Sequence, residues 1–160
     1  MKIVIALLVG LASASPVFAQ TNINLGGISA DPSAAVEISA DNLSVDQDTG
    51  TAVFSGNVVI GQGALRLSAG SVRVVYAEET GDIAQLMASG GVTFVTDTQA
   101  AEAASADYNL TTGQLTLSGN VLLSQGASAL SADKMTVDLT SGTAQMSGRV
   151  RTVFQQDGGN

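Results

Sequence analysis

An internal repeat constrains the fold of this chain more than any other feature of its sequence. The tetrapeptide Ser-Gly-Asn-Val occurs at Ser55–Val58 and again, 63 residues later, at Ser118–Val121. When Ser55–Val75 is aligned without gaps to Ser118–Asp138, 11 of the 21 positions are identical. Two unrelated segments of this length would share about one or two identities, so the match indicates a repeated structural unit.

Each long repeat divides again, which gives four shorter units. Three short motifs each occur four times: a Ser-Ala step, a polar turn that ends in glycine, and a Ser-Gly-x-Val step. The Ser-Ala steps begin at Ser39, Ser68, Ser105 and Ser131, the turns end at Gly50, Gly81, Gly113 and Gly142, and the Ser-Gly-x-Val steps begin at Ser55, Ser89, Ser118 and Ser147. Glycine adopts the positive φ that hairpin turns require. The sequence therefore predicts a strand, a glycine turn and a strand, repeated four times.

Between the turns, apolar and polar residues alternate with a period of two. The segments Val36–Asp41 and Leu65–Gly70 show this alternation clearly. A sheet with one apolar face and one solvated face requires such a pattern, whereas an amphipathic helix requires a period of 3.6. The prediction is an all-β, antiparallel protein whose stacked units line one continuous apolar interior.

The composition excludes several classes of function. The chain of 160 residues contains no cysteine and no histidine, and it has 6 Lys+Arg against 14 Asp+Glu. Without Cys or His there is no disulfide, zinc finger or Ser-His-Asp triad. An acidic chain is also poorly suited to nucleic acid. The sequence predicts a protein that is not an enzyme, with no cofactor, no metal and no nucleic-acid partner.

The first nineteen residues are predicted to be a cleaved secretory signal. Lys2 supplies the positive charge, Ile3–Leu11 is the apolar stretch, and Val17–Ala19 places small residues before cleavage at Gln20. A retained membrane anchor is the weaker alternative, because the apolar run is shorter than the about 20 residues that a span needs. We expect residues 20–35 to be a flexible lead-in, residues 36–154 the β domain and residues 155–160 a polar tail.

The apolar interior admits two interpretations. A closed core is the ordinary one. The second is a groove for an apolar ligand, because small residues recur at inward positions and leave room between layers: Ala40, Ala69, Ala106 and Ala132.

The repeated motifs resemble the OstA-like family of lipopolysaccharide-transport proteins. The resemblance rests on Ile38–Asp41, Phe54–Ile60, Gln62-Gly63 and Leu67–Ala69, and in the second half on Ala106–Tyr108, Leu117–Val121, Gln125-Gly126 and Ala132-Asp133. It covers residues 36–154. One departure is Gly70, which stands where the pattern has Asp.

The resemblance implies an antiparallel β-jelly-roll, slightly twisted and open along one side. Such a protein would reside in the periplasm and carry lipopolysaccharide from the inner-membrane complex to the outer-membrane translocon, with the acyl chains inside. It would meet an LptC-like protein at its N-terminal edge and an LptD-like protein at its C-terminal edge, and it could form head-to-tail oligomers. The alternative is an adhesin-like structural β-repeat with a closed core and no lipid cargo.

The resemblance also assigns residues to roles. The residues expected to contact acyl chains are Val36, Ile38, Phe54, Phe94, Tyr108, Leu110 and Leu117. The expected partner strands are Val36–Ala40 and Ala144–Phe154, represented by Val36, Ile38, Ala40, Met146, Val150 and Thr152. Arg149 and Arg151 could meet ligand phosphates, or form salt bridges at the rim.

Overall fold

The computed structural model describes residues 22–24, 31 and 33–154. The predicted signal segment and the predicted polar tail lie outside these residues. Within them, thirteen strands form one antiparallel sheet, which confirms the all-β jelly-roll class. This part of the chain contains no helix that is long and apolar enough to cross a membrane.

Four of the strands, in two consecutive pairs, have 11 or 12 residues, and the others have seven or fewer. In chain order they are β1 (Asn22–Asn24), β2 (Val36–Ser39), β3 (Asn42–Asp46), β4 (Thr51–Gln62), β5 (Leu65–Tyr76), β6 (Ile83–Ser89), β7 (Val92–Val95), β8 (Gln99–Ala103), β9 (Ser105–Asn109), β10 (Gln114–Gln125), β11 (Ser128–Asp138), β12 (Thr143–Ser147) and β13 (Arg151–Val153).

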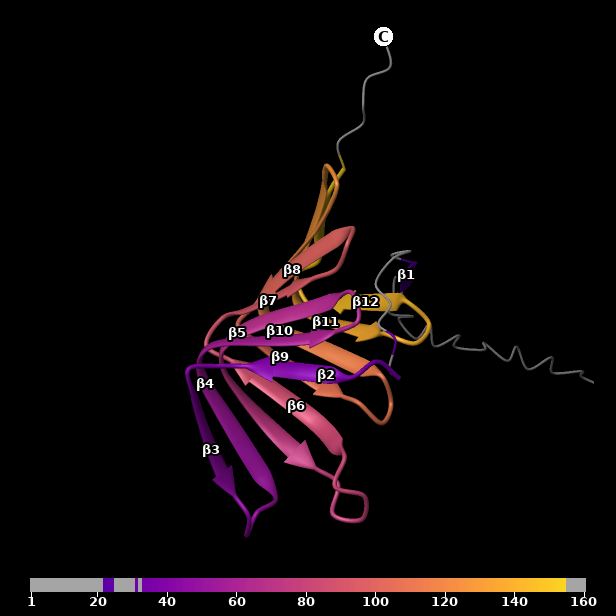
Figure 1. Cartoon of the computed structure of the whole chain (residues 1–160). Coiled ribbons are helices and arrows are strands. Elements are labelled where there is room, and N and C mark those ends of the chain that lie inside the picture. The colour runs from indigo at the N-terminus through magenta and orange to yellow at the C-terminus, as the bar shows by residue number, and fades with distance from the viewer. Residues whose placement is uncertain (1–21, 25–30, 32, 155–160) are drawn as a thin grey trace, which may run out of the picture.

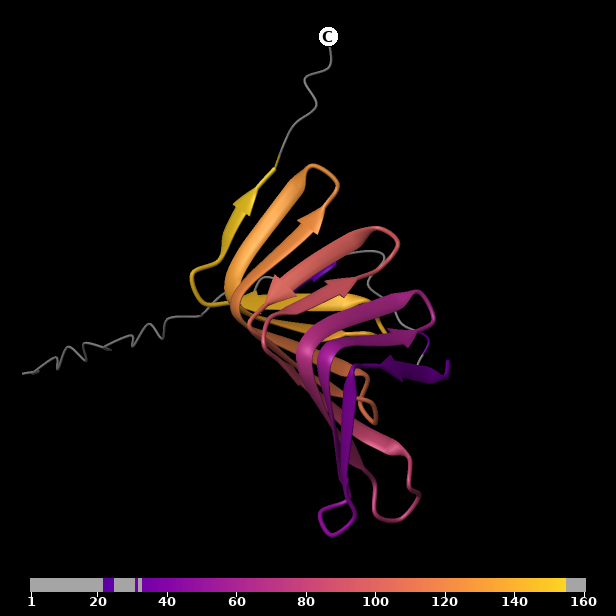
Figure 2. The same ribbon diagram turned by 60° about the vertical axis from the view of Figure 1, so that its left-hand side comes forward.

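The long strands β4, β5, β10 and β11 pass through a bend and belong to two layers. The register of β4 on β5 shifts between Ser55 and Val58, and that of β10 on β11 shifts between Ser118 and Val121. A bulge of this kind bends the strand and increases its twist. The two halves of each long strand therefore diverge from a common bend, as the arms of the ribbon do in Figures 1 and 2.

The halves assemble into two layers with a shared set of bends. The first layer runs β3, the start of β4, the end of β5, β6, β9, the start of β10, the end of β11, β12 and β1. The second layer runs β2, the end of β4, the start of β5, β7, β8, the end of β10, the start of β11 and β13. The fold is a roll whose two layers enclose the apolar faces.

The four Ser-Gly-x-Val steps of the sequence are the bends between the layers. In each step the glycine and the residue after it both have positive φ, for example 80° at Gly56 and 46° at Asn57. Asn120 and Arg149 occupy the same position as Asn57 in their units, with φ of 48° and 46°. Glycine and asparagine tolerate this conformation better than other residues, so the repeated Gly-Asn pair encodes the bend.

The third Ser-Ala step, at Ser105, was wrongly aligned with the other three. Backbone N–H groups of Asp41 and Asp133 donate to the glycine carbonyls of the bends at Gly56 and Gly148, and in the third unit the N–H of Ala104 donates to Gly119. The equivalent of the Ser-Ala step is therefore Glu102-Ala103, three residues earlier. A glutamate in place of serine hid it from sequence comparison.

The departure at Gly70 has a steric cause. A Cβ atom added to Gly70 would lie 3.1 Å from the carbonyl oxygen of Gly90 and 3.4 Å from its Cα. Both are backbone atoms of the second bend, so neither can move aside easily. The aspartate that the family pattern has at this position does not fit here, because Gly90 comes too close.

The strand β1 lies inside the segment that was expected to be a lead-in without regular structure. It pairs with β12 in antiparallel register, with Ile23 opposite Ala144. A short run of three residues has no readable period, which is why the sequence did not reveal it. Strand β1 therefore extends the first layer beyond β12, at the end of the layer where the C-terminal strands lie.

Candidate functional site

The space between the two layers is lined by continuous rows of apolar residues. In the second layer one row of directly opposed apolar residues runs Ile38, Ile60, Leu67, Phe94, Ala101, Leu123 and Leu130, and it ends at the polar residue Thr152. In the first layer a comparable row runs Val45, Ala52, Val74, Leu86, Tyr108, Leu115, Val137 and Ala144. Both rows cross from the N-terminal to the C-terminal end of the sheet.

Next to the bends, the inward positions of the second layer are occupied by valine and alanine, which pair with each other within the layer. Val58 pairs with Ala69, Val92 with Ala103, and Val121 with Ala132. All six residues are buried. Such small side chains suit the region where the two layers converge at the bends, from which the strands diverge towards the hairpin turns (Figure 2).

The residues predicted to contact acyl chains all lie on this interior. Phe94, Tyr108 and Leu117 are buried in the core, and Val36, Ile38, Phe54 and Leu110 are half-buried against it. They come from both layers. The structure shows where these residues lie. Their contact with acyl chains remains a prediction.

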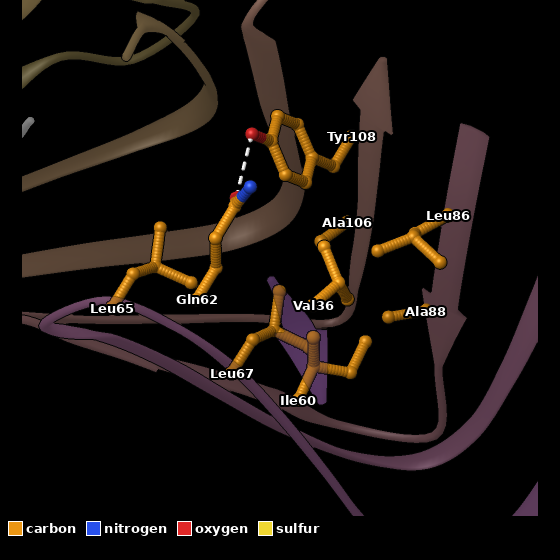
Figure 3. A pocket seen from close by; sticks show the side chains of 9 residues that line it. All are labelled: Val36, Ile60, Gln62, Leu65, Leu67, Leu86, Ala88, Ala106 and Tyr108. Atoms are coloured by element: carbon orange, nitrogen blue, oxygen red, sulfur yellow. Dashed lines mark hydrogen bonds between the residues drawn. The ribbon is translucent and has the colours of Figure 1, made fainter. Parts of the chain in front are cut away.

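The interior is densely packed, and at the N-terminal end it opens into a surface hollow whose lining includes Val36, Ile83 and Leu110. A cavity of about 10 Å³ remains near the N-terminal end, lined by Val36, Ile60, Gln62, Leu65, Leu67, Leu86, Ala88, Ala106 and Tyr108 (Figure 3). Such a cavity holds one water molecule at most. An acyl chain needs far more room, so the layers would have to separate to admit one.

A buried polar contact joins the two layers at this cavity. The hydroxyl of Tyr108 donates a hydrogen bond of 3.0 Å to Oε1 of Gln62, and Nε2 of Gln62 donates one of 3.2 Å to the carbonyl oxygen of Ala34 (Figure 3). Burial raises the pKa of the Tyr108 phenol, because the ionised form loses its hydration. The contact ties β9 of the first layer to β4 of the second.

Sequence reasoning missed Gln62 as a residue of the interior. A polar residue next to a glycine turn is ordinarily exposed, although the parity of Gln62 matches that of Val58 and Ile60. Gln62 is only 2% exposed. The alternation, carried to the end of the strand, was the signal that could have identified it.

At the N-terminal end of the roll, two strands form the edges. β2 is the edge of the second layer and contains Val36 and Ile38, and β3 is the edge of the first layer. Leu43 and Val45 of β3 are 56% and 61% exposed, although they oppose Phe54 and Ala52 on the interior side. The apolar interior therefore continues to the surface at this end, and β3 is an edge strand that the sequence did not identify.

At the C-terminal end, the three residues predicted to form the partner edge lie in different parts of the fold. Thr152 lies in β13, which is the edge of the second layer. Met146 lies in β12, which pairs with β11 on one side, while β1 pairs on the other side with residues 143–145, so most of the outer edge of β12 is covered. Val150 lies in the loop before β13, and it is half exposed.

The two arginines near this end do not face the interior. Arg149 forms a salt bridge with Asp133, with Nη2 2.6 Å from Oδ1, across the fourth bend. Hydrogen bonding from Arg149 lowers the pKa of the Asp133 carboxyl. Arg151 opposes Ser131 on the outer face of β13 and is exposed. The salt-bridge alternative is therefore the one that applies to Arg149.

The described residues contain no group of three or more acidic side chains that could hold a metal ion. The carboxylates in the acidic turns instead accept hydrogen bonds within their own turns. Asp46 and Asp138 accept hydrogen bonds from backbone N–H groups two and three residues further on, which lowers the pKa of both carboxyls. These contacts stabilise the hairpin turns.

Comparison with known proteins agrees with this architecture. Residues 37–143 match the family model described as LptA/(LptD N-terminal domain) LPS transport protein. No curated protein sequence matches the chain. Among solved structures, the chain is similar to LptH, the LptA-homologous periplasmic component of the lipopolysaccharide transport device from Pseudomonas aeruginosa. The two share 17% identity with a TM-score of 0.71, over 79% of this chain and 99% of LptH. The family model covers more than half of the sequence, and the chain therefore belongs to the LptA/LptD N-terminal domain family of lipopolysaccharide transport proteins.

Proposed function

We propose that this protein is a periplasmic bridge that binds lipopolysaccharide and carries it from an inner-membrane complex to an outer-membrane translocon. The observation that carries the proposal is the continuity of the apolar rows. The row of the second layer passes through Phe94 and Leu123 at its middle and contains no polar residue between Ile38 and Leu130. Membership of the family and the predicted secretory signal support the periplasmic location.

The physical basis is burial of acyl chains against these rows. Each methylene removed from water contributes about 0.8 kcal/mol, so a chain held between the layers is strongly favoured over one in solvent. Neighbouring positions along a row offer similar apolar surroundings. A lipid can therefore advance by small steps with little change in free energy, and its direction of travel must be set by an energy source elsewhere.

The packed interior requires that the layers separate on binding. The contact between Tyr108 and Gln62 is a cross-layer hydrogen bond, and most of the interior between the layers is apolar packing. Acyl chains can replace such packing with contacts of the same kind. The bends, where two consecutive residues have positive φ, are the natural place for the angle between the layers to change.

The edges of the sheet supply the sites for protein partners. Edge strands carry unpaired backbone N–H and C=O groups, and a strand from a neighbour can satisfy them by extending the sheet. We assign β2 and β3 to an LptC-like partner, and β13 with the end of the first layer to an LptD-like partner. The same edges would allow head-to-tail association of copies of this chain.

Photocrosslinking in cells tests the proposal. A photoreactive phenylalanine at Phe94 or Ile38 is expected to capture lipopolysaccharide, because both positions lie on the interior row. The same residue at Asp48 or Glu79, in exposed turns, is expected to give no adduct. Absence of adducts from both interior positions, in protein that accumulates normally, would refute lipid carriage.

The closed packing favours one alternative, a structural β-repeat with a permanent core. That alternative predicts no adducts at any position and no change in the packing of Tyr108 when lipopolysaccharide is added to the purified protein. Tyrosine fluorescence distinguishes the two cases, since Tyr76 and Tyr108 are the only tyrosines in the sequence. A Tyr76→Phe variant reports on Tyr108 alone.

A further inference from the structure

A row of uncharged polar side chains borders the second layer along the side where the roll opens. Five residues of this row form what we call the polar lip: Gln62, Thr96, Gln99, Gln125 and Ser128; the buried Leu65, which opposes Gln62, interrupts it. They lie at the hairpin ends of β4, β7, β8, β10 and β11. Gln99 opposes Gln125, Gln125 opposes Ser128, and the N–H of Thr96 donates to the carbonyl of Gln99. The polar lip continues the parity of the interior rows and so faces inward.

The polar lip is buried to an unusual degree for its chemistry. Gln62, Thr96 and Gln99 are 2%, 8% and 3% exposed, and they are the three buried polar residues of the described chain. The hydroxyl oxygen of Thr96 is buried and has no hydrogen-bond partner among the described residues. Burying a hydroxyl in this way costs about 1–3 kcal/mol, so its position calls for a partner that the protein itself does not supply.

The facing layer has no counterpart to the polar lip. The residues at the hairpin ends of the first layer that face inward include Ile83, Leu110 and Leu139, all hydrophobic. An apolar chain therefore meets apolar surface along most of the first layer, apart from the Tyr108 hydroxyl, but it meets amide and hydroxyl groups where it leaves the second layer. This asymmetry matches an amphiphile that has a polar junction at one end of its chains.

The polar lip is also neutral, which restricts the chemistry of that junction. Arg66, the basic residue nearest to Gln62 and Thr96 in the sheet, lies on the outer face and donates Nη1 to the carbonyl oxygens of Gly63 and Leu65. A phosphate would require cationic partners. Amide and hydroxyl groups instead suit carbonyl oxygens, to which Gln and Thr donate, and hydroxyl or amide hydrogens, which they accept.

We propose that the polar lip binds the ester and amide carbonyl groups through which acyl chains join the sugar head group of the lipid. The chains then lie between the layers, and the sugars and phosphates lie outside the roll. This inference rests on the proposed lipid-carrier function and adds to it the place where the boundary between polar and apolar parts of the lipid is recognised. Thr96 is the central member.

A pair of probe lipids and two matched pairs of variants test this inference. The probes are a synthetic glucosamine amphiphile with ester-linked chains and its ether-linked counterpart, which lacks the carbonyl oxygens. Thr96→Val and Gln125→Met remove polar groups from the polar lip. Thr93→Val and Gln114→Met make the same changes at exposed positions on the outer faces of β7 and β10. Binding of each probe is measured by titration with the intact purified protein.

The expected result is that the natural chain prefers the ester-linked probe by about three- to tenfold, the effect of one or two hydrogen bonds. Thr96→Val and Gln125→Met should each reduce that preference and leave affinity for the ether-linked probe unchanged, whereas the outer-face controls should keep it. Thermal unfolding shows which variants are folded, and Thr→Val preserves the side-chain shape.

Two different failures can be told apart. Equal affinity of the natural chain for both probes, or a preference that survives both lip substitutions, overturns the role of the polar lip and leaves lipid carriage intact. Failure of the natural chain to bind either probe, together with no crosslink at Phe94, overturns lipid carriage itself and the polar lip with it.

Discussion

The hydroxyl of Tyr108 in β9 donates a 3.0 Å hydrogen bond to Oε1 of Gln62 in β4, and this buried contact joins the two layers of the roll. Gln62 lies at a hairpin end of the second layer, and Tyr108 lies one residue before the turn region of the first. Both residues line the cavity that remains between the layers. The contact therefore links the packing of the interior to the side on which the roll opens.

Replacing Tyr108 with Phe is expected to lower the free energy of unfolding by about 1–2 kcal/mol. The substitution keeps the ring but leaves Oε1 of Gln62 buried without its donor, which costs more than the hydrogen bond alone contributes. Urea denaturation measures the change. Tyr76→Phe, at a position that is 36% exposed, is the matched control and should alter stability by less than about 0.5 kcal/mol. Equal effects of the two variants would contradict the role of the contact.

Alkaline pH is expected to destabilise the protein partly through Tyr108. Burial raises the folded-state pKa of this phenol above its ordinary value of 10.0. The stabilising contribution is complete below pH 10 and is lost as pH rises through the folded-state pKa, because the unfolded chain loses its proton first. Urea midpoints between pH 9 and pH 11 should fall less steeply for Tyr108→Phe than for the natural chain. Parallel curves would show that another group dominates.

Substitution by alanine is expected to change the stability of the fold at Gly70 but much less at Gly61. Neither glycine has a positive φ, so steric fit decides the outcome. A Cβ at Gly70 meets backbone atoms of Gly90 at 3.1 and 3.4 Å, whereas one at Gly61 meets the Arg66 guanidinium, which can move. Gly70→Ala is expected to destabilise by about 1–2 kcal/mol, and Gly61→Ala to change stability by less than about 0.5 kcal/mol. Thermal or urea unfolding decides, and a neutral Gly70→Ala would contradict the steric account.

Ile23→Pro is expected to increase head-to-tail association. Proline lacks the N–H group and disrupts a strand of three residues, so the edge of β12 at Ala144 becomes available to another chain. Sedimentation velocity at one fixed concentration should show a larger oligomeric fraction than for the natural chain. Ile23→Val, which keeps the N–H group, is the control. An unchanged distribution for Ile23→Pro would show that β1 does not compete for this edge.

Much of the architecture could be predicted from the sequence because each repeat contains patterns that can be recognised within a short segment. Alternation with a period of two identified the strands, and the glycine turns at Gly50 and Gly113 were placed where hairpins occur. The role of the Ser-Gly-x-Val step was not predicted. Two consecutive residues with positive φ form a bend only when the layers on either side pack together, and that depends on partners far apart in the sequence, such as Gln62 and Tyr108.

The candidate site was predictable in part. The inward residues followed from alternation and family resemblance, so Phe94, Tyr108 and Leu117 lie where the pattern put them. Gln62 and Thr96 were missed because a polar residue beside a turn is ordinarily exposed. Only the approach of the first layer buries them.

The sequence by itself determined the class of structure and the family, because period, turn chemistry and repeat spacing are local properties that each segment carries alone. The tertiary structure decided which apolar rows face each other, that the interior is densely packed, and that β1 covers β12. It also decided that five polar residues from three hairpins lie along one side of the second layer. These features depend on contacts between distant segments, and the repeat recorded in the sequence is only the unit from which they are built.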